Sequence, residues 1–142
     1  MNLSAQNLSS GLEDYIETIY MSYLTQTPLK GAELARKLDV SRASVSEALS
    51  KLVAKGLIKY SSYEAISLTD NGVIEAQKVY AKHHILKDFF ETVLKISPKE
   101  AGENACKIEH IISQNILNKM QKFTQFCQNS PDCIKEFEKE LN

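Results

Sequence analysis

The chain has 142 residues, 43% of them apolar, which is enough for one compact domain or two small ones with a buried core. Seventeen basic and eighteen acidic residues give a net charge of −1, so the overall charge gives no sign of a polyanion-binding tail, an acidic buffer protein or a chain that binds membrane surfaces. We expect a cytoplasmic protein, because no apolar run approaches the roughly 20 residues of a membrane span and the N-terminus lacks a signal peptide. Three cysteines are too few for a disulfide scaffold, and five Gly and three Pro favour helices.

The N-terminal elements are predicted from helix caps and apolar spacing. A first helix is expected over residues 10–24, opened by a Ser10–Glu13 capping box. The segment GAELARKLDV predicts a short second helix. Ser41 is placed to cap a third helix, which Gly56 ends. The apolar stripe of the first helix consists of Leu12, Ile16, Ile19, Tyr20 and Tyr23.

The connection between the second and third helices, at residues 38–41, is a tight turn. This layout is typical of a helix-turn-helix motif whose third helix is the recognition helix. The apolar segments LIKY and AISL follow, separated by SSYE, and they predict a two-stranded hairpin. The sequence therefore predicts a winged helix-turn-helix domain, to which we assign residues 1–71.

Four more helices are predicted from residues that can cap a helix N-terminus. These caps are Thr69, Ser97, Ser113 and Ser130. The first of these helices should extend to Val93, and the second should run from Pro98 to Ile112. Residues 72–142 should thus form a helical second domain, and the fold class is mainly α.

The charge is unevenly distributed along the chain. From Lys30 to Lys59 there are seven basic and three acidic residues, so this segment carries +4 and the remainder −5. A basic winged-helix segment is expected where one face meets DNA phosphates. The alternative is a helix-turn-helix that serves only as a protein interaction module.

The outward face of the third helix supplies the candidate DNA contacts. Arg42 can bond guanine bidentately, Ser46 can bond either kind of base edge, and Glu47 can accept from cytosine N4. Lys51 and Lys59 suit phosphate contacts. The full set of expected DNA-contacting residues is Arg42, Ala43, Ser44, Ser46, Glu47, Ser50, Lys51 and Lys59.

A second set of residues has the chemistry of metal ligands. Cys106, Glu109 and His110 stand at i, i+3 and i+4, so a helix would present a thiolate, a carboxylate and an imidazole on one face. Each residue taken alone is better explained as a structural or solvated side chain. His83 fits a core histidine, and the acidic pair Asp14 and Glu17 fits a helix N-terminus. Spacing alone does not join these groups.

Five separated segments carry a resemblance to a known family. They are LEDYIETIY, SRASVSEALSKLVAKGLIKY, the Leu68-Thr69-x-x-Gly72 junction, KHHILKDFF and ACKIEHIIS. Together, over approximately residues 12–120, they resemble the metal-dependent transcriptional repressors typified by the diphtheria toxin repressor. The resemblance is strongest to the short manganese-transport-regulator branch, and we expect no C-terminal SH3-like domain.

The resemblance implies a function and a metal site. It implies a homodimer that represses metal-uptake genes, binds double-stranded DNA at a palindromic operator, uses a divalent metal as co-repressor and is not an enzyme. The ligands carried over by the resemblance are Asp14, Glu17, His83, Cys106, Glu109 and His110. The family's ancillary site would fall on Lys87 and Gly102, which cannot bind metal, so that site is expected to be absent.

The implied ligand set combines features of two branches of the family. The manganese branch usually has a carboxylate at the position of Cys106, and the iron branch has a methionine at the position of Asp14. A thiolate favours softer metals and carboxylates suit Mn²⁺, so the expected cofactor is Mn²⁺ or Fe²⁺, with Zn²⁺ or Co²⁺ able to substitute in vitro.

Two alternatives remain open at this point. One is a metal-independent winged-helix regulator that senses oxidants through Cys106, Cys127 or Cys133. The other is a small metallohydrolase. The sequence weighs against the hydrolase, because it has no HExxH motif, no Gly-rich phosphate loop and no evident nucleophile with its base.

Overall fold

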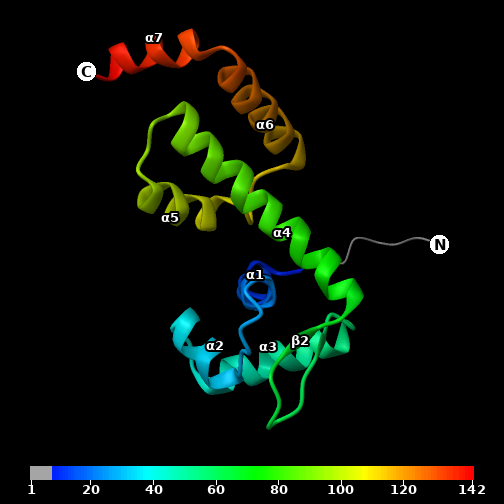
Figure 1. Ribbon diagram of the computed structural model, residues 1–142. Coiled ribbons are helices and arrows are strands. Elements are labelled where there is room, and N and C mark those ends of the chain that lie inside the picture. Colours follow the sequence, from blue (N-terminus) through cyan, green and yellow to red (C-terminus); the bar gives the residue numbers. More distant parts are fainter. Residues whose placement is uncertain (1–7) are drawn as a thin grey trace, which may run out of the picture. The chain divides into compact units, whose positions relative to one another are not determined.

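The computed structural model describes residues 8–142, so the expectation of no signal peptide falls partly on residues 1–7, outside the described part. The chain divides into two compact units, Met1–Val79 and Tyr80–Asn142, and helices dominate both (Figure 1). This confirms the mainly α fold class. The boundary expected after residue 71 stays a prediction, because helix α4 (Asp70–Asp88) runs through that point and through the boundary between the units.

Helix α1 (Ser10–Leu24) begins one residue earlier than the predicted cap requires. Ser9 is the N-cap, and its side chain accepts a hydrogen bond from the Leu12 backbone N–H at 3.3 Å. The predicted Ser10–Glu13 capping box is therefore wrong: counted from Ser9, Glu13 lies one position beyond the place a capping box needs. Tyr23 is also 53% exposed, so the buried apolar stripe of α1 ends at Tyr20.

The helix-turn-helix forms as predicted from α2 (Gly31–Leu38) and α3 (Arg42–Ala54). Asp39 closes α2 in the left-handed conformation (φ 53°), which Asp tolerates better than most residues. Ser41 caps α3 by accepting from the Ser44 backbone N–H at 3.1 Å. Helix α1 packs against both α2 and α3, and residues Ile16, Leu34, Leu49 and Leu52 between them are fully buried.

The wing consists of β1 (Ile58–Lys59) and β2 (Ser67–Leu68), which pair antiparallel with Ile58 opposite Leu68. Both strands are shorter than the predicted LIKY and AISL segments. The chain between them is a loop (Figure 1). The Ile66 backbone N–H donates to the Leu29 carbonyl at 2.8 Å, which fastens the base of this loop to the segment before α2.

The Leu68-Thr69-x-x-Gly72 junction joins the wing to α4. The Thr69 hydroxyl donates to the Gly56 carbonyl at 2.6 Å and accepts from the Gly72 backbone N–H at 3.0 Å, which confirms its predicted role as a cap. The Thr69 backbone N–H donates to the Leu57 carbonyl at 3.0 Å. A Cβ at position 72 would overlap that same carbonyl oxygen, so only glycine fits there.

In the second unit, α4 continues into the π-helical turn η1 (Phe89–Val93). The prediction of one α-helix to Val93 is therefore wrong. The hydrogen bonding changes to the π-helical pattern, in which an N–H bonds the carbonyl five residues earlier: the Leu94 backbone N–H donates to the Phe89 carbonyl at 3.3 Å. In this turn the Phe89 ring lies 6.3 Å from the Phe123 ring.

Three helices complete the second unit: α5 (Pro98–Ile108), α6 (Gln114–Asn129) and α7 (Pro131–Leu141). Ser97 and Ser113 cap α5 and α6 as predicted, whereas Ser130 makes no side-chain cap to α7. Helix α5 ends at Ile108 rather than at Ile112, and in the turn that follows the backbone N–H groups of Ile111 and Ile112 both donate to the Ile108 carbonyl. The core of this unit is formed by Leu86, Ala105 and Leu117.

No helix among the described residues is long and apolar enough to cross a membrane.

Candidate metal centre and nucleic-acid interface

A cluster of three metal-competent side chains lies in the second unit. His83 is placed on α4, one turn before the buried Leu86, and its side chain is 16% exposed. Cys106 is exposed near the end of α5, whose opposite face buries Ala101 and Ala105. Two helices that share one core thus supply the two residues.

Glu109 is the third member, and it follows the last residue of α5. It is the C-cap of that helix and retains helical dihedrals (φ −55°, ψ −28°), so it stays roughly one turn beyond Cys106 as the spacing predicts. Its side chain is 0% exposed. A carboxylate at such a place requires charged or hydrogen-bonding neighbours, because burial of an unpaired charge is costly.

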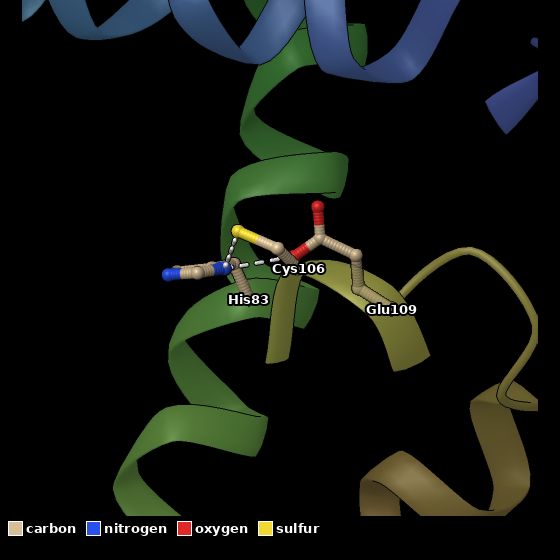
Figure 2. A group of neighbouring side chains, drawn as sticks. All are labelled: His83, Cys106 and Glu109. Atoms are coloured by element: carbon tan, nitrogen blue, oxygen red, sulfur yellow. Dashed lines mark hydrogen bonds and ion pairs between the residues drawn. The ribbon is translucent and has the colours of Figure 1, made fainter. Parts of the chain in front are cut away.

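The three side chains point toward one another (Figure 2). The distance between His83 Nδ1 and Glu109 Oε2 is 2.9 Å, and Cys106 Sγ lies 3.7 Å from His83 Nδ1. One donor atom from each residue falls within 4.8 Å of the others. Two atoms that bind one ion at about 2.1 Å lie roughly 3 to 3.5 Å apart, and a sulfur stands slightly farther out. The donor set therefore fits a divalent metal.

His110 extends this cluster within the second unit. Its Nε2 lies 3.7 Å from Glu109 Oε1, and its side chain is 9% exposed. Helix α5 ends at Ile108, so Glu109 and His110 belong to the turn that follows the helix, whereas Cys106 lies in the helix itself.

Asp14 and Glu17, the other predicted ligands, lie on α1 in the first unit. They are separated by about one helical turn, and the Thr18 hydroxyl donates to the Asp14 carbonyl at 2.9 Å. Their participation in a metal site stays a prediction from the resemblance.

The predicted DNA-contacting residues are all exposed in the first unit. On α3 the buried residues Val45, Ala48 and Leu49 face the core, and the opposite face is polar. Exposed there are Arg42, Ala43, Ser44, Ser46, Glu47, Ser50 and Lys51, and Lys59 is exposed on β1. Glu47 and Lys51 form an ion pair at 3.0 Å, which spacing permits but which was not predicted.

Sequence reasoning missed three polar residues next to this face. Lys30, Tyr60 and Ser62 line one hollow together with Arg42 and Ser46. They come from the start of α2 and from the wing, so no sequence periodicity relates them to α3. Their position beside the recognition helix is a product of the fold alone.

Comparison with known families identifies the two halves of the chain. Residues 7–66 match the N-terminal DNA binding domain of the iron dependent repressors, and residues 69–138 match the metal binding and dimerisation domain of the same proteins. The chain belongs to the iron-dependent repressor family. This confirms the resemblance to metal-dependent repressors, and it makes the protein a transcriptional regulator rather than an enzyme.

Individual relatives agree with this assignment. The chain is 36% identical over 119 residues to the uncharacterised HTH-type transcriptional regulator MJ0568 of Methanocaldococcus jannaschii, covering 83% of this chain and 95% of the relative. It is 28% identical over 124 residues to the HTH-type transcriptional regulator MntR of Listeria monocytogenes, covering 87% of each.

A solved structure of a manganese-dependent transcriptional repressor in complex with manganese is also similar. Its TM-score is 0.75 at 26% identity, and the match covers 81% of this chain and 53% of that one. The chain thus spans about half the length of that repressor. The family's two domains support DNA and a second copy of the chain as partners, and a divalent metal as cofactor.

Proposed function

We propose that the protein is a repressor of metal-uptake genes that binds its operator when a divalent metal is bound. The observation that carries the proposal is the convergence of His83, Cys106 and Glu109, with donor atoms within 4.8 Å of one another. The cluster lies within the part of the chain that matches the family's metal binding and dimerisation domain. A basic winged helix in the other part supplies the means to bind DNA.

The proposed ligands are the three clustered residues, His110, and Asp14 and Glu17 of α1. The last two are included on the strength of the family resemblance. A bound divalent ion would supply positive charge that carboxylates and a thiolate can share. If ligands from both domains bind the same ion, the DNA-binding domain would adopt fewer positions, and the DNA-competent state would be favoured.

The proposed metal is Mn²⁺ or Fe²⁺. Carboxylate and imidazole donors suit either ion, and the Cys106 thiolate raises the affinity for Fe²⁺, Co²⁺ and Zn²⁺ relative to Mn²⁺. The names of two relatives, a manganese-dependent repressor and MntR, favour manganese by analogy.

DNA would be bound by two copies of the chain at a palindromic operator, since a symmetric dimer places two recognition helices on two half-sites. Helix α3 would enter the major groove with Arg42, Ser46 and Glu47 toward base edges. Lys51 and Lys59 would contact phosphates and fix the register. A regulator of this kind must reach chromosomal DNA, so we propose a cytoplasmic location.

A binding titration tests the proposal. The affinity for promoter fragments of metal-uptake genes is measured by fluorescence anisotropy without metal and with Mn²⁺, anaerobic Fe²⁺ or Zn²⁺. We expect Mn²⁺ or Fe²⁺ to raise the affinity at least tenfold, which corresponds to about 1.4 kcal/mol of coupling.

Two variants make the titration specific. Glu109→Gln keeps the size of the buried side chain and removes its charge, so it should abolish the metal response. Glu103→Gln changes an exposed carboxylate on α5 and should leave the response intact. An operator affinity that neither Mn²⁺ nor Fe²⁺ changes would refute the proposal.

A further inference from the structure

Two thiols meet at the corner between α6 and α7, in the same unit as the metal cluster but in other elements. Cys127 lies in the last turn of α6 and is 1% exposed, whereas Cys133 lies in the first turn of α7 and is exposed. The chain between them is tightly folded: the Ser130 backbone N–H donates to the Cys127 carbonyl at 3.2 Å, and the Cys133 backbone N–H donates to the Ser130 carbonyl at 3.1 Å.

The two thiols line the same hollow and lie close enough to interact. The Cys127 and Cys133 side chains hydrogen-bond to each other, and burial together with this bond raises the pKa of the Cys127 thiol. Cys127 is thereby kept as a protonated, shielded thiol next to one that solvent reaches. Such a pair has an accessible sulfur that an oxidant can reach and a second sulfur nearby that can resolve the product.

Both thiols line an apolar hollow that α7 helps to enclose. The hollow is lined by Phe89 and Val93 of η1, by Phe123 of α6, and by Ile134 and Phe137 of α7. Helix α7 has no buried residue of its own, and an ion pair between Lys95 and Glu138 at 3.2 Å adds to its attachment. Its noncovalent attachment is therefore slight, so a covalent bond at this corner would change how firmly α7 is held.

We propose that Cys127 and Cys133 are a redox modification site, which a peroxide converts into a reversible disulfide that fixes α7 to α6. The Cys133 sulfur attacks one peroxide oxygen, the O–O bond breaks, and water leaves as a sulfenic acid forms. The Cys127 sulfur then attacks the Cys133 sulfur, its proton joins the departing hydroxide as a second water, and the S–S bond closes. One peroxide is reduced and two thiols are oxidised.

The disulfide is independent of the metal cluster, whose thiol is Cys106. Oxidation at the corner would keep Ile134 and Phe137 in the wall of the apolar hollow, which they share with the π-helical end of the helix that carries His83. Reduction by a dithiol returns the original state.

The sequence offers a direct assay. Trypsin cleaves after Lys122 and Lys135 and nowhere between them, so one peptide, residues 123–135, contains both cysteines. Cys106 falls in a separate peptide, residues 100–107. The full chain is exposed to hydrogen peroxide, remaining thiols are alkylated, and the peptides are weighed without reduction. We expect peptide 123–135 to lose the mass of two hydrogen atoms, and a dithiol to restore it.

Matched variants and a second readout define the outcome. The mass loss should persist in Cys106→Ser and vanish in Cys133→Ser, which changes an exposed side chain, and in Cys127→Ala. Cleavage at Lys139 within α7 should become several-fold slower on oxidation in the unaltered chain and not in Cys133→Ser. Sulfinic acid at Cys133 without mass loss, disulfides that include Cys106, or disulfides between chains would each overturn the proposal.

Discussion

At position 72 the surrounding atoms leave room for glycine only. A Cβ there would overlap the Leu57 carbonyl oxygen and lie 3.2 Å from Leu68 Cδ2. The backbone of α4 therefore passes too close to the wing for any side chain. This contact gives a physical reason for the glycine of the Leu68-Thr69-x-x-Gly72 junction.

Replacing Gly72 should destabilise the DNA-binding domain. We expect Gly72→Ala to lower the free energy of unfolding by about 1–3 kcal/mol or more, because the added methyl group has no space to occupy. Gly11→Ala is the matched control: it lies in α1 with nothing within 4 Å of an added Cβ, so its effect should stay within about 1 kcal/mol. Urea denaturation measures both, and equal stability of the two variants would contradict this account.

Cys106 is the residue whose chemistry bears most on the choice of metal. It is exposed and lies 3.7 Å from His83 Nδ1, so an alkylating reagent reaches it in the metal-free protein. If it is a ligand, Mn²⁺ or Co²⁺ should slow its alkylation by iodoacetamide several-fold, because a metal-bound sulfur is a poorer nucleophile.

The other cysteines are internal controls for this measurement. Cys133 is exposed and should react at the same rate with and without metal. Cys127 should react slowest, because it is buried and burial raises its pKa. An unchanged Cys106 rate under conditions where calorimetry shows metal bound would remove Cys106 from the ligand set.

At the scale of elements, α3 combines a buried face with a polar face that carries one acidic residue. Glu47 lies between Ser46 and Ser50 in the predicted reading surface and pairs with Lys51 at 3.0 Å. A carboxylate at this place repels phosphates and can accept a hydrogen bond from cytosine. Glu47 should therefore reduce the affinity for random-sequence DNA and increase the preference for the operator over other sequences.

The Glu47→Gln variant tests that role. We expect its affinity for random-sequence DNA to rise, and its preference for the operator to fall by roughly 1–3 kcal/mol, about the value of one base contact. Competition binding at fixed salt measures both quantities, with Glu103→Gln on α5 as the control. A fall in affinity for every sequence alike would instead show that Glu47 serves to position Lys51.

The ends of the elements were harder to predict than their existence. Ser9 and Ser10 are adjacent residues with the same hydroxyl, so local chemistry does not decide between them as caps. Helix α5 ends at Ile108 and α4 changes to a π-turn at Phe89, where no glycine or proline marks the change. Both places lie against the shared core of the second unit, where packing outweighs propensity.

For the whole molecule, metal binding should appear as added stability. A ligand that binds the folded state alone, at about 100 times its Kd, stabilises that state by about 2.7 kcal/mol. We therefore expect Mn²⁺ to raise the midpoint temperature of thermal unfolding and a chelator to reverse that rise. In Glu109→Gln the shift should be absent, whereas in Glu103→Gln it should be retained. A midpoint that Mn²⁺ leaves unchanged in the unaltered chain would argue against a metal site that exists only in the folded protein.

Most of the helices, the caps at Ser41, Thr69, Ser97 and Ser113, and the winged-helix order could be predicted from local sequence, because these depend on hydrogen bonds and periodicity within a few residues. The family resemblance selected the candidate ligands. The contacts of His83 with Cys106 and Glu109, which are 23 and 26 residues away, and the shared hollow of the Cys127 and Cys133 thiols could be seen only in three dimensions. Such contacts depend on how helices pack around Leu86, Ala105 and Leu117, and that packing cannot be predicted from the residues of any one short segment.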